Sequence, residues 1–289
     1  MEDNKKKQVD SWISGVSYEV AFWNGYLSNR KNASDIVNRV TEKRELVLSG
    51  ISLSDIENPM DYKVLDVGCG MVYANGQYMN GIKADFHYVD PLAEFYNEIA
   101  TKKKLDLPKI EFGMIEYLSS FYEKNTVSLI IVQNALDHCF DPLKGTRECL
   151  KTLKCGGKLY LFHRNNEAEH ENYQGFHQYN ITTENGHLVF WNKEQHIDVN
   201  DFFADKFDIY IEEIDDHIMA ILTKKTDYDY EDNDSLDLAN QLMYAISHFL
   251  SSKFVFSYIA KYSYQRFFHF FSGKFGTTFK EKIKKIIGR

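Results

Sequence analysis

Short apolar runs alternate with helix-like stretches through the middle of the chain. Between the runs lie the stretches 92–104, 117–123 and 142–153, and the last begins with Pro142 and leads into Cys-Gly-Gly. Alternating buried strands and helices predict βαβ units, and hence an α/β, Rossmann-like, mostly parallel sheet with helices on both faces. The five predicted strands are 63–69, 86–90, 109–115, 128–136 and 157–162.

The alternation stops after the fifth run. Residues 164–197 form a long polar and aromatic insertion, with a hairpin signal at Glu184-Asn185-Gly186-His187. Because loops of this length in a compact domain are usually functional, we expect a substrate lid here. A short helix is predicted at 198–206. The runs 207–214 and 217–225 then predict an antiparallel hairpin that closes the sheet.

Both ends of the chain differ from this central domain at 61–226. Residues 1–60 are polar, with aromatic residues at helical spacing, and predict an N-terminal helical cap. Residues 227–237 contain six acids in eleven positions and predict a solvated hinge. The remainder of 227–289 predicts a C-terminal helical appendage, rich in Phe and Tyr and basic at its end.

Charge and cysteine content narrow the class of protein. Of 289 residues, 34 are Lys or Arg and 42 are Asp or Glu, and the net charge of −8 argues against nucleic acid as the main partner. The four cysteines have no zinc-site spacing, as expected for reduced thiols in the cytoplasm. The first residues, MEDNKKKQVD, show no signal-peptide pattern, so we expect a cytoplasmic protein.

The most informative motif is Leu-Asp-Val-Gly-Cys-Gly at 65–70. A strand that ends in Gly-x-Gly lets the backbone approach a ligand at the carboxyl edge of a sheet. Asp90 ends the next strand, where its carboxylate can accept hydrogen bonds from both ribose hydroxyls of an adenosine. A nicotinamide dehydrogenase is the rival class, but its third glycine is replaced by Tyr73.

Together these motifs resemble those of the class I S-adenosylmethionine-dependent methyltransferases over residues 61–225. The similar segments are LDVGCG at 65–70, VDPLAEFY at 89–96, FGMIEYL at 112–118, VQNALDHCFDP at 132–142 and LKCGGKLYLFH at 153–163. The resemblance implies S-adenosylmethionine as cofactor, S-adenosylhomocysteine as product, and a closing hairpin. It places Asp90 at the ribose and Met114 and Ile115 beside adenine, although many members have an acid at the position of Met114. The remaining cofactor positions that it implies are Asp66, Gly68, Cys69, Gly70, Pro91 and Asn134.

A narrower resemblance is to bacterial methyltransferases that accompany surface-polysaccharide (capsule or O-antigen) biosynthesis. It lies in the segments 19–23, 90–93, 134–138, 166–168 and 175–177. It implies O-methylation of a sugar or sugar-phosphate hydroxyl, with Trp23, Asn165, Glu167 and Tyr173 as acceptor contacts. Two alternatives stay open: a methyltransferase acting on a phosphate-type or small-amine acceptor, and a non-catalytic cofactor-binding partner subunit.

Histidines supply the candidate general bases. Five of the ten histidines fall within 34 residues, but their spacing fits no common zinc motif, so we expect no metal. His138 follows the fourth predicted strand on the ligand side of the sheet, which makes it the first candidate for the base. Asp137 or Asp141 can fix its tautomer. His163 and His177 are the competitors.

The aromatic and basic C-terminal tail has two interpretations. Its aromatic residues can cover the catalytic domain or form a homodimer interface. Alternatively, the apolar and basic residues of 274–289 can bind the inner face of a membrane as a peripheral helix. The sequence leaves both open.

Overall fold

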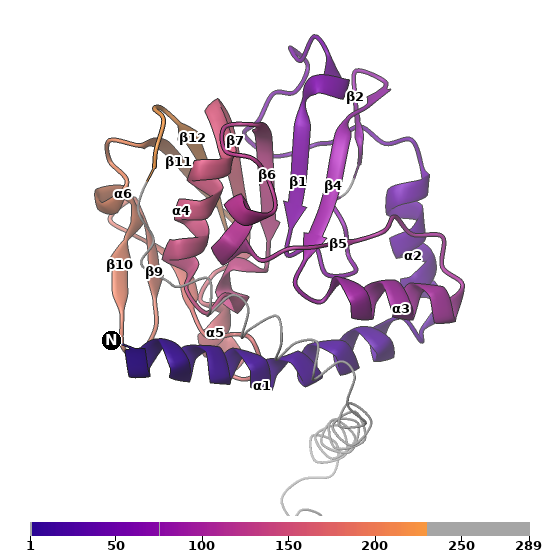
Figure 1. Cartoon of the computed structure of the whole chain (residues 1–289), viewed down its shortest axis with the longest axis horizontal. Helices are drawn as coiled ribbons and strands as arrows, with labels where there is room; N and C mark the ends of the chain where they lie inside the picture. Colours follow the sequence, from indigo (N-terminus) through magenta and orange to yellow (C-terminus); the bar gives the residue numbers. More distant parts are fainter. Residues whose placement is uncertain (1, 75, 230–289) are drawn as a thin grey trace, which may run out of the picture.

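The central sheet has seven strands in the order β11-β12-β7-β6-β1-β4-β5 (Figure 1). The computed structural model describes residues 2–74 and 76–229. Parallel pairing joins the five strands from β5 to β7, whereas β12 pairs antiparallel with both β7 and β11. The strands are β1 (Lys63–Val67), β4 (Asp85–Asp90), β5 (Glu111–Phe112), β6 (Val127–Gln133), β7 (Leu153–Arg164), β11 (Phe207–Ile214) and β12 (His217–Lys224). The predicted α/β fold, with five parallel strands and a closing hairpin, is confirmed.

Side chains of alternate residues build a core on each face of this sheet. Leu65 and Ile130 point to the side covered by α4 (Pro142–Thr152), which begins where Asp141 accepts a hydrogen bond from the Lys144 N–H at 2.9 Å. On the other face, Val64 and Leu129 pack against Leu46, Leu48 and Leu53 and against the hairpin of β2 (Tyr78–Met79) and β3 (Ile82–Lys83).

The prediction that residues 1–60 form a helical cap is wrong for residues 42–58. They contain no helix; they run as loops with isolated bridges from Glu45 to Tyr78 and from Leu48 to Ile51. Their leucines cover the sheet face where we expected a helix. A short 3₁₀ turn, η1 (Pro59–Asp61), leads into β1.

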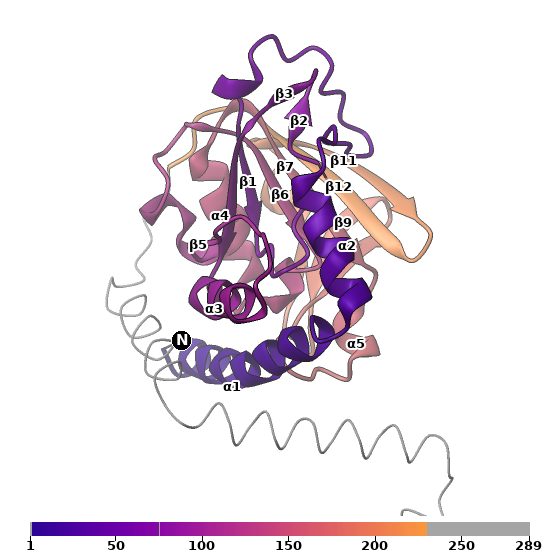
Figure 2. The ribbon, with the colours of Figure 1, turned by 90° about the vertical axis from the view of Figure 1, so that its right-hand side faces the viewer.

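The helical part of the cap is α1 (Glu2–Tyr26) and α2 (Arg30–Thr41). In Figures 1 and 2, α1 runs along the edge of the sheet at which β1 ends, next to α3 (Ala93–Lys103). The Trp23 ring lies edge-on to that of Tyr96 on α3, with centroids 6.4 Å apart. The cap thus closes the edge where the parallel strands end.

The insertion at 164–197 has a small sheet of its own, in the order β10-β9-β8. β8 (Asn180–Glu184) and β9 (His187–Trp191) form the predicted hairpin, whereas the third strand, β10 (His196–Asp198), was not predicted. The insertion begins with α5 (Glu167–His170), and α6 (Val199–Phe202) follows it. Ile181, Leu188 and Phe190 join the core on the α4 side.

Two further predictions differ from the structure. The strand expected at 109–115 is only the two-residue β5, and the helix expected at 117–123 is the 3₁₀ helix η2 (Ile115–Ser120). The predictions for the tail beyond residue 229 lie outside the described residues. Within the described part, no helix combines the length and apolar character needed to cross a membrane.

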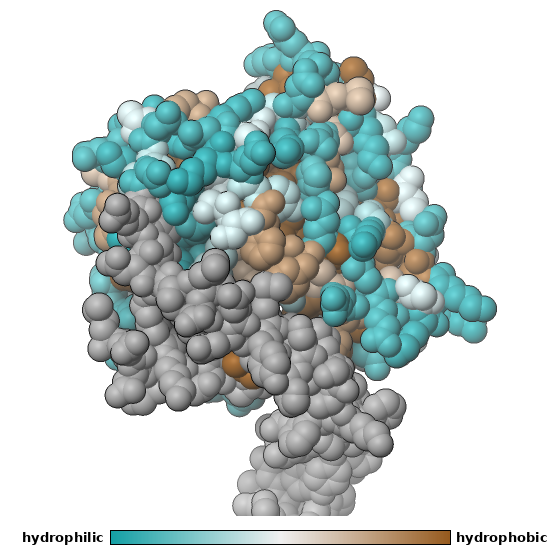
Figure 3. Space-filling view, in the orientation of Figure 1, coloured by the Kyte–Doolittle hydropathy of each residue, from teal (hydrophilic) through white to brown (hydrophobic). Residues whose placement is uncertain are grey.

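The face shown in Figure 3 is largely hydrophilic, with apolar side chains gathered near its middle.

Candidate active site

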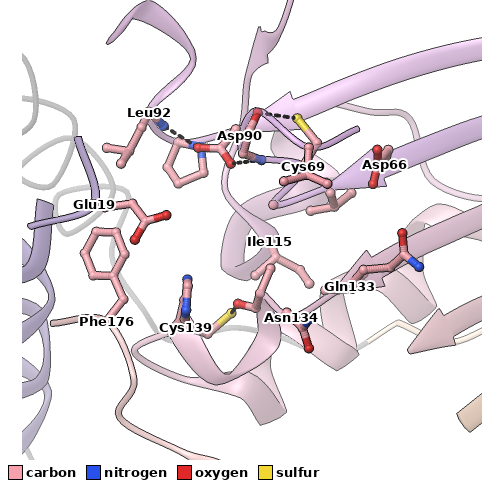
Figure 4. A pocket seen from close by; sticks show the side chains of 18 of the residues that line it. Glu19, Asp66, Cys69, Asp90, Leu92, Ile115, Gln133, Asn134, Cys139 and Phe176 are labelled. Atoms are coloured by element: carbon pink, nitrogen blue, oxygen red, sulfur yellow. Dashed lines mark hydrogen bonds between the residues drawn. The ribbon is translucent and has the colours of Figure 1, made fainter. Parts of the chain in front are cut away.

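A cavity of about 730 Å³ lies at the carboxyl ends of the parallel strands. Its walls come from the loops after β1, β4, β5 and β6, from α1, and from the insertion. In Figure 4, Asp66 and Asp90 lie along one wall, and Asn134, Cys139 and Phe176 lie along the facing wall. Open α/β sheets bind ligands at this edge because the strand ends and their loops leave a crevice there.

The glycine turn after β1 needs both of its glycines. Gly68 and Gly70 have φ values of +67° and +52°, in the left-handed region that favours glycine. A Cβ on Gly68 would lie 2.5 Å from the Ala135 side chain. At Gly70, a Cβ would come within 3.2 Å of the Trp23 ring. The turn therefore brings backbone against the cavity where a side chain would clash.

Backbone N–H groups hold the two acids of this wall in place. Asp90 accepts hydrogen bonds from the N–H groups of Gly70 (2.9 Å) and Leu92 (2.8 Å). Asp66 accepts one from the Ala74 N–H at 2.7 Å. Burial raises the pKa of each carboxyl to about 7, although these hydrogen bonds oppose the shift.

Glu116 is a buried acid that the sequence reasoning did not select. It is 3% exposed, lines the cavity, and accepts a hydrogen bond from the Phe140 N–H at 3.0 Å. Burial raises its pKa to about 7 as well. Glu116 lies two residues after Met114, where many members of the family have an acid, and this was the signal in the sequence that could have identified it. With three such carboxyls, the cavity favours a ligand that carries positive charge.

All nine predicted cofactor positions line this one cavity. The structure brings together Asp66, Gly68, Cys69, Gly70, Asp90, Pro91, Met114, Ile115 and Asn134. The side chain of Asn134 is already engaged, because its Oδ1 accepts a hydrogen bond from the Arg164 N–H at 2.9 Å. The donors and acceptors on these walls suit an adenosine with a charged substituent.

Three histidines surround one buried carboxylate, Asp137, beside the facing wall. His177 Nδ1 lies 2.8 Å from Asp137 Oδ2, and His138 Nε2 lies 3.5 Å from the same oxygen. His163 Nδ1 lies 3.8 Å from Oδ1. Burial alone would raise the pKa of Asp137, but the surrounding imidazoles outweigh it and lower this pKa to about 2. Asp137 and His138 belong to the 3₁₀ turn η3 (Leu136–His138), which follows β6.

The three candidate bases have different surroundings. His138 and His177 line the cavity, whereas His163 does not and is 1% exposed. Burial is the main cause that lowers the pKa of His163 to about 4. Burial opposes the charged form of His177 too, but the hydrogen bond and charge of Asp137 prevail and its pKa is raised. The sequence suggested Asp137 as a partner of His138 only, whereas its hydrogen bond is with His177.

The predicted acceptor contacts divide into two pairs. Trp23 and Glu167 line the cavity, but Asn165 and Tyr173 do not. The Tyr173 hydroxyl accepts a hydrogen bond from Asn180 Nδ2 at 3.0 Å, and the Asn165 N–H donates to the Asp216 carbonyl at 2.9 Å. Other residues that line the cavity and were not predicted are Trp12, Tyr18, Glu19, Arg39, Arg164, Glu171, Phe176 and His217.

Cap and insertion meet across this end of the cavity. The rings of Trp12 on α1 and Phe176 in the insertion are stacked, with centroids 5.0 Å apart and planes 13° from parallel. The same Phe176 lies 5.7 Å from the His138 ring. Residues of the insertion at 164–197 thus line one wall of the site.

Residues 65–161 match the family model described as "Methyltransferase domain", and no curated protein matches the chain. Among solved structures, the chain is similar to the CurJ carbon methyltransferase (12% identity, 60% of this chain and 51% of that chain, TM-score 0.41). It is similar to the T. thermophilus 16S rRNA N2 G1207 methyltransferase in complex with AdoMet and guanosine (12% identity, 62% of this chain and 39% of that chain, TM-score 0.37). A third similar structure is a SAM dependent methyltransferase from Aquifex aeolicus (16% identity, 57% of this chain and 83% of that chain, TM-score 0.35). This chain spans about half of the first and less than half of the second.

The matched segment runs from the glycine turn to the middle of β7, and it contains every predicted cofactor position. The predictions of methyltransferase chemistry and of its cofactor are confirmed at this level. Residues 65–161 match a methyltransferase domain, and S-adenosylmethionine is its cofactor.

Proposed function

We propose that the protein O-methylates a hydroxyl of a sugar or sugar-phosphate, as an enzyme of surface-polysaccharide biosynthesis. The observation that carries the proposal is the placement of the Asp137–His177 pair at the end of the cavity opposite Asp90. A sugar hydroxyl has a high pKa, so it needs a proton acceptor beside the cofactor. A carboxylate-oriented imidazole meets that need near neutral pH.

The chain's own residues support binding of the cofactor. Asp90 is placed for the ribose hydroxyls, and Met114 and Ile115 for the adenine ring. Asp66, Glu116 and the glycine turn surround the remaining space with negative charge and backbone N–H groups. When bound, S-adenosylmethionine supplies a methyl group activated by its sulfonium charge. The rest of the site has to align the acceptor oxygen and exclude water, and alignment alone is worth several kcal/mol.

For the base, the geometry favours His177 over His138. Asp137 accepts a hydrogen bond from His177 Nδ1, which leaves Nε2 as the acceptor nitrogen of the neutral ring. His138 stands close by, with its ring centroid 4.5 Å from that of His177, and remains the alternative base. His163, behind Asp137 and outside the cavity, is better suited to holding that carboxylate in position.

The acceptor end has the composition of a carbohydrate site. The stacked Trp12 and Phe176 rings offer an apolar platform, while Arg164, Glu167 and Glu171 offer charged hydrogen-bonding groups. The net charge of −8 and the absence of zinc-type cysteine spacing support a small glycan acceptor in the cytoplasm rather than a nucleic acid. A phosphate-type acceptor is the alternative that Arg164 favours.

The test is an acceptor screen with the full chain. S-adenosylmethionine is incubated with sugars, nucleotide-sugars, phosphate-type compounds and small amines, and S-adenosylhomocysteine is measured. The proposal predicts turnover with a sugar-containing acceptor and a mass increase of one methyl group on its oxygen. Turnover only with amines would move the assignment to N-methylation. Binding of S-adenosylhomocysteine without turnover on any acceptor would favour the non-catalytic partner subunit.

A further inference from the structure

Three metal-type donors from two distant segments meet at the acceptor end of the cavity. The Asp137 carboxylate and the His138 imidazole follow β6, and the His177 imidazole comes from the insertion. One ligand atom from each lies within 4.8 Å of the others. The spacing of histidines along the chain gave no sign of this group, because it is the fold that joins residues forty positions apart.

The distances suit a shared cation. A divalent transition metal bound at about 2.0–2.2 Å holds neighbouring donor atoms roughly 3 Å apart. His177 Nδ1 and His138 Nε2 lie 2.8 Å and 3.5 Å from Asp137 Oδ2. The three donor atoms lie within 4.8 Å of one another, so rotation of the side chains would be needed to bring them onto one ion. Two imidazoles with one carboxylate also leave coordination positions open for a substrate or water.

A second observation indicates that this carboxylate is under-coordinated. Asp137 is 3% exposed, and its Oδ1 has no hydrogen-bond partner among the described residues. Behind it, both ring nitrogens of His163 also lack partners in the described part of the chain. Buried polar atoms without partners are rare, and an ion or a water molecule commonly satisfies them. The unpartnered Oδ1 faces His163, whose Nδ1 lies 3.8 Å away, whereas Oδ2 faces His138 and His177. A cation bound through Oδ2 would add to the charge compensation that the imidazoles already provide.

We propose that Asp137, His138 and His177 form a binding site for a divalent first-row transition cation, of the Zn²⁺, Co²⁺ or Mn²⁺ class. Nitrogen donors favour these ions over Mg²⁺ and Ca²⁺, which prefer oxygen ligands alone. Because His138 and His177 line the cavity, the open positions face the space where the acceptor binds.

The proposal rests on the proposed function and adds a role to it. A cation at this site would bind the acceptor hydroxyl and lower its pKa. The O–H bond then breaks with its electron pair left on oxygen, and the proton passes to solvent water. In that case His177 acts as a ligand and not as the proton acceptor, so the two roles of His177 make different predictions.

The test is a titration of the metal-stripped full chain with Zn²⁺ alone and with Co²⁺ alone. We expect one tight site per chain, with Co²⁺ giving a visible spectrum of nitrogen and oxygen ligation. His138→Ala and His177→Ala should each weaken binding by tenfold or more. His187→Ala is the matched control, because His187, Asp198 and Asp201 form a second, more exposed group of donors elsewhere on the chain.

Equal weakening in all three variants, weakening in His187→Ala alone, or no site at all would overturn the proposal. Thermal melting and S-adenosylhomocysteine titration of each variant show whether it is folded, and Asp137→Asn gives an independent second variant. Full turnover by the stripped chain in excess chelator would remove the cation from catalysis and leave His177 as base. A chain that binds Zn²⁺ but not S-adenosylhomocysteine would instead contradict the proposed function.

Discussion

The two ends of the cavity are built in different ways. At the cofactor end, Asp66 and Asp90 are fixed by backbone N–H groups of nearby turns, at 2.7 to 2.9 Å. At the acceptor end, Asp137 is held by side chains, and His177 reaches it from forty residues away. A backbone-held acid depends little on the rest of the chain. The acceptor end depends on how cap and insertion pack, which is where acceptor specificity can vary while the cofactor end stays the same.

Electrostatics separates the two ends as well. Burial raises the pKa values of Asp66, Asp90 and Glu116 to about 7, so these carboxyls are poised to lose protons when a cation arrives. The pKa of Asp137 is lowered to about 2, because three imidazoles stabilise its charge against burial. The cofactor end therefore favours a positively charged ligand, whereas at the acceptor end the charge of Asp137 is already compensated by nearby histidines.

The largest expected effect is at the acceptor end. His177→Ala should lower kcat by about 10²-fold or more, because it removes the group that either accepts the acceptor's proton or binds the cation. The affinity for S-adenosylhomocysteine should change little, since His177 lies at the other end of the cavity. Steady-state kinetics and calorimetry on one preparation give both values. His138→Ala is the companion variant, and a larger loss there would return the assignment to His138.

Next in size is the cofactor end. Asp90→Ala removes the carboxylate placed for the ribose hydroxyls, and each charge-assisted hydrogen bond lost costs about 1.5–3 kcal/mol. S-adenosylhomocysteine affinity should fall at least tenfold, measured by calorimetry. Asp90 also holds two backbone N–H groups, so Asp90→Asn, which keeps an oxygen acceptor, serves as the control for folding. Wild-type affinity in Asp90→Ala would remove Asp90 from the cofactor site.

A smaller effect is expected from pH. Between pH 6 and 8 the three cofactor-end carboxyls pass from mostly protonated to mostly ionised, because their pKa values are about 7. The ionised forms attract the sulfonium, so S-adenosylmethionine should bind more tightly as pH rises through this range. S-adenosylhomocysteine lacks that charge and should gain less. Glu116→Gln should reduce the difference between the two ligands; parallel pH curves in the wild type would contradict the account.

The smallest effect concerns the contact between cap and insertion. Trp12→Ala removes the ring stacked on Phe176, a pair worth about 0.5–1.5 kcal/mol beyond the area that it buries. We expect the KM for the acceptor to rise a few-fold, with cofactor affinity nearly unchanged. Tyr210→Ala, at an exposed position on β11 far from the cavity lining, is the matched aromatic control. An equal change in both variants would mean a general loss of stability.

These two ends also differ in how far the sequence predicts them. The five parallel strands and the closing hairpin followed from local patterns. Local patterns also drew attention to the glycine turn and to Asp90, whereas most of the other cofactor positions were implied by the resemblance; all nine line the cavity. Glu116 was not predicted because a single buried acid adds nothing to the hydrophobic periodicity of the sequence. The extended path of 42–58 was missed because the helical spacing of the aromatic residues at 12–26 was extended to the whole of 1–60.

The acceptor end was predicted only in fragments. His138, His163 and His177 were each candidates, but no local pattern shows that all three surround Asp137. Asn165 and Tyr173 were expected as acceptor contacts but lie outside the cavity lining, where they bond Asp216 and Asn180 instead. The positions of these side chains depend on packing between distant segments, which the spacing of residues along the chain does not reveal.

The most direct test of the account is a pair of calorimetric titrations of the wild-type full chain, one with S-adenosylhomocysteine and one with NADH. Both ligands contain an adenosine that Asp90 can bind, but the missing third glycine at Tyr73 and the acidic cavity favour the first. The account predicts saturable binding of one S-adenosylhomocysteine per chain and no comparable binding of NADH. Tighter binding of NADH, or no binding of S-adenosylhomocysteine, would contradict the assignment of this cavity.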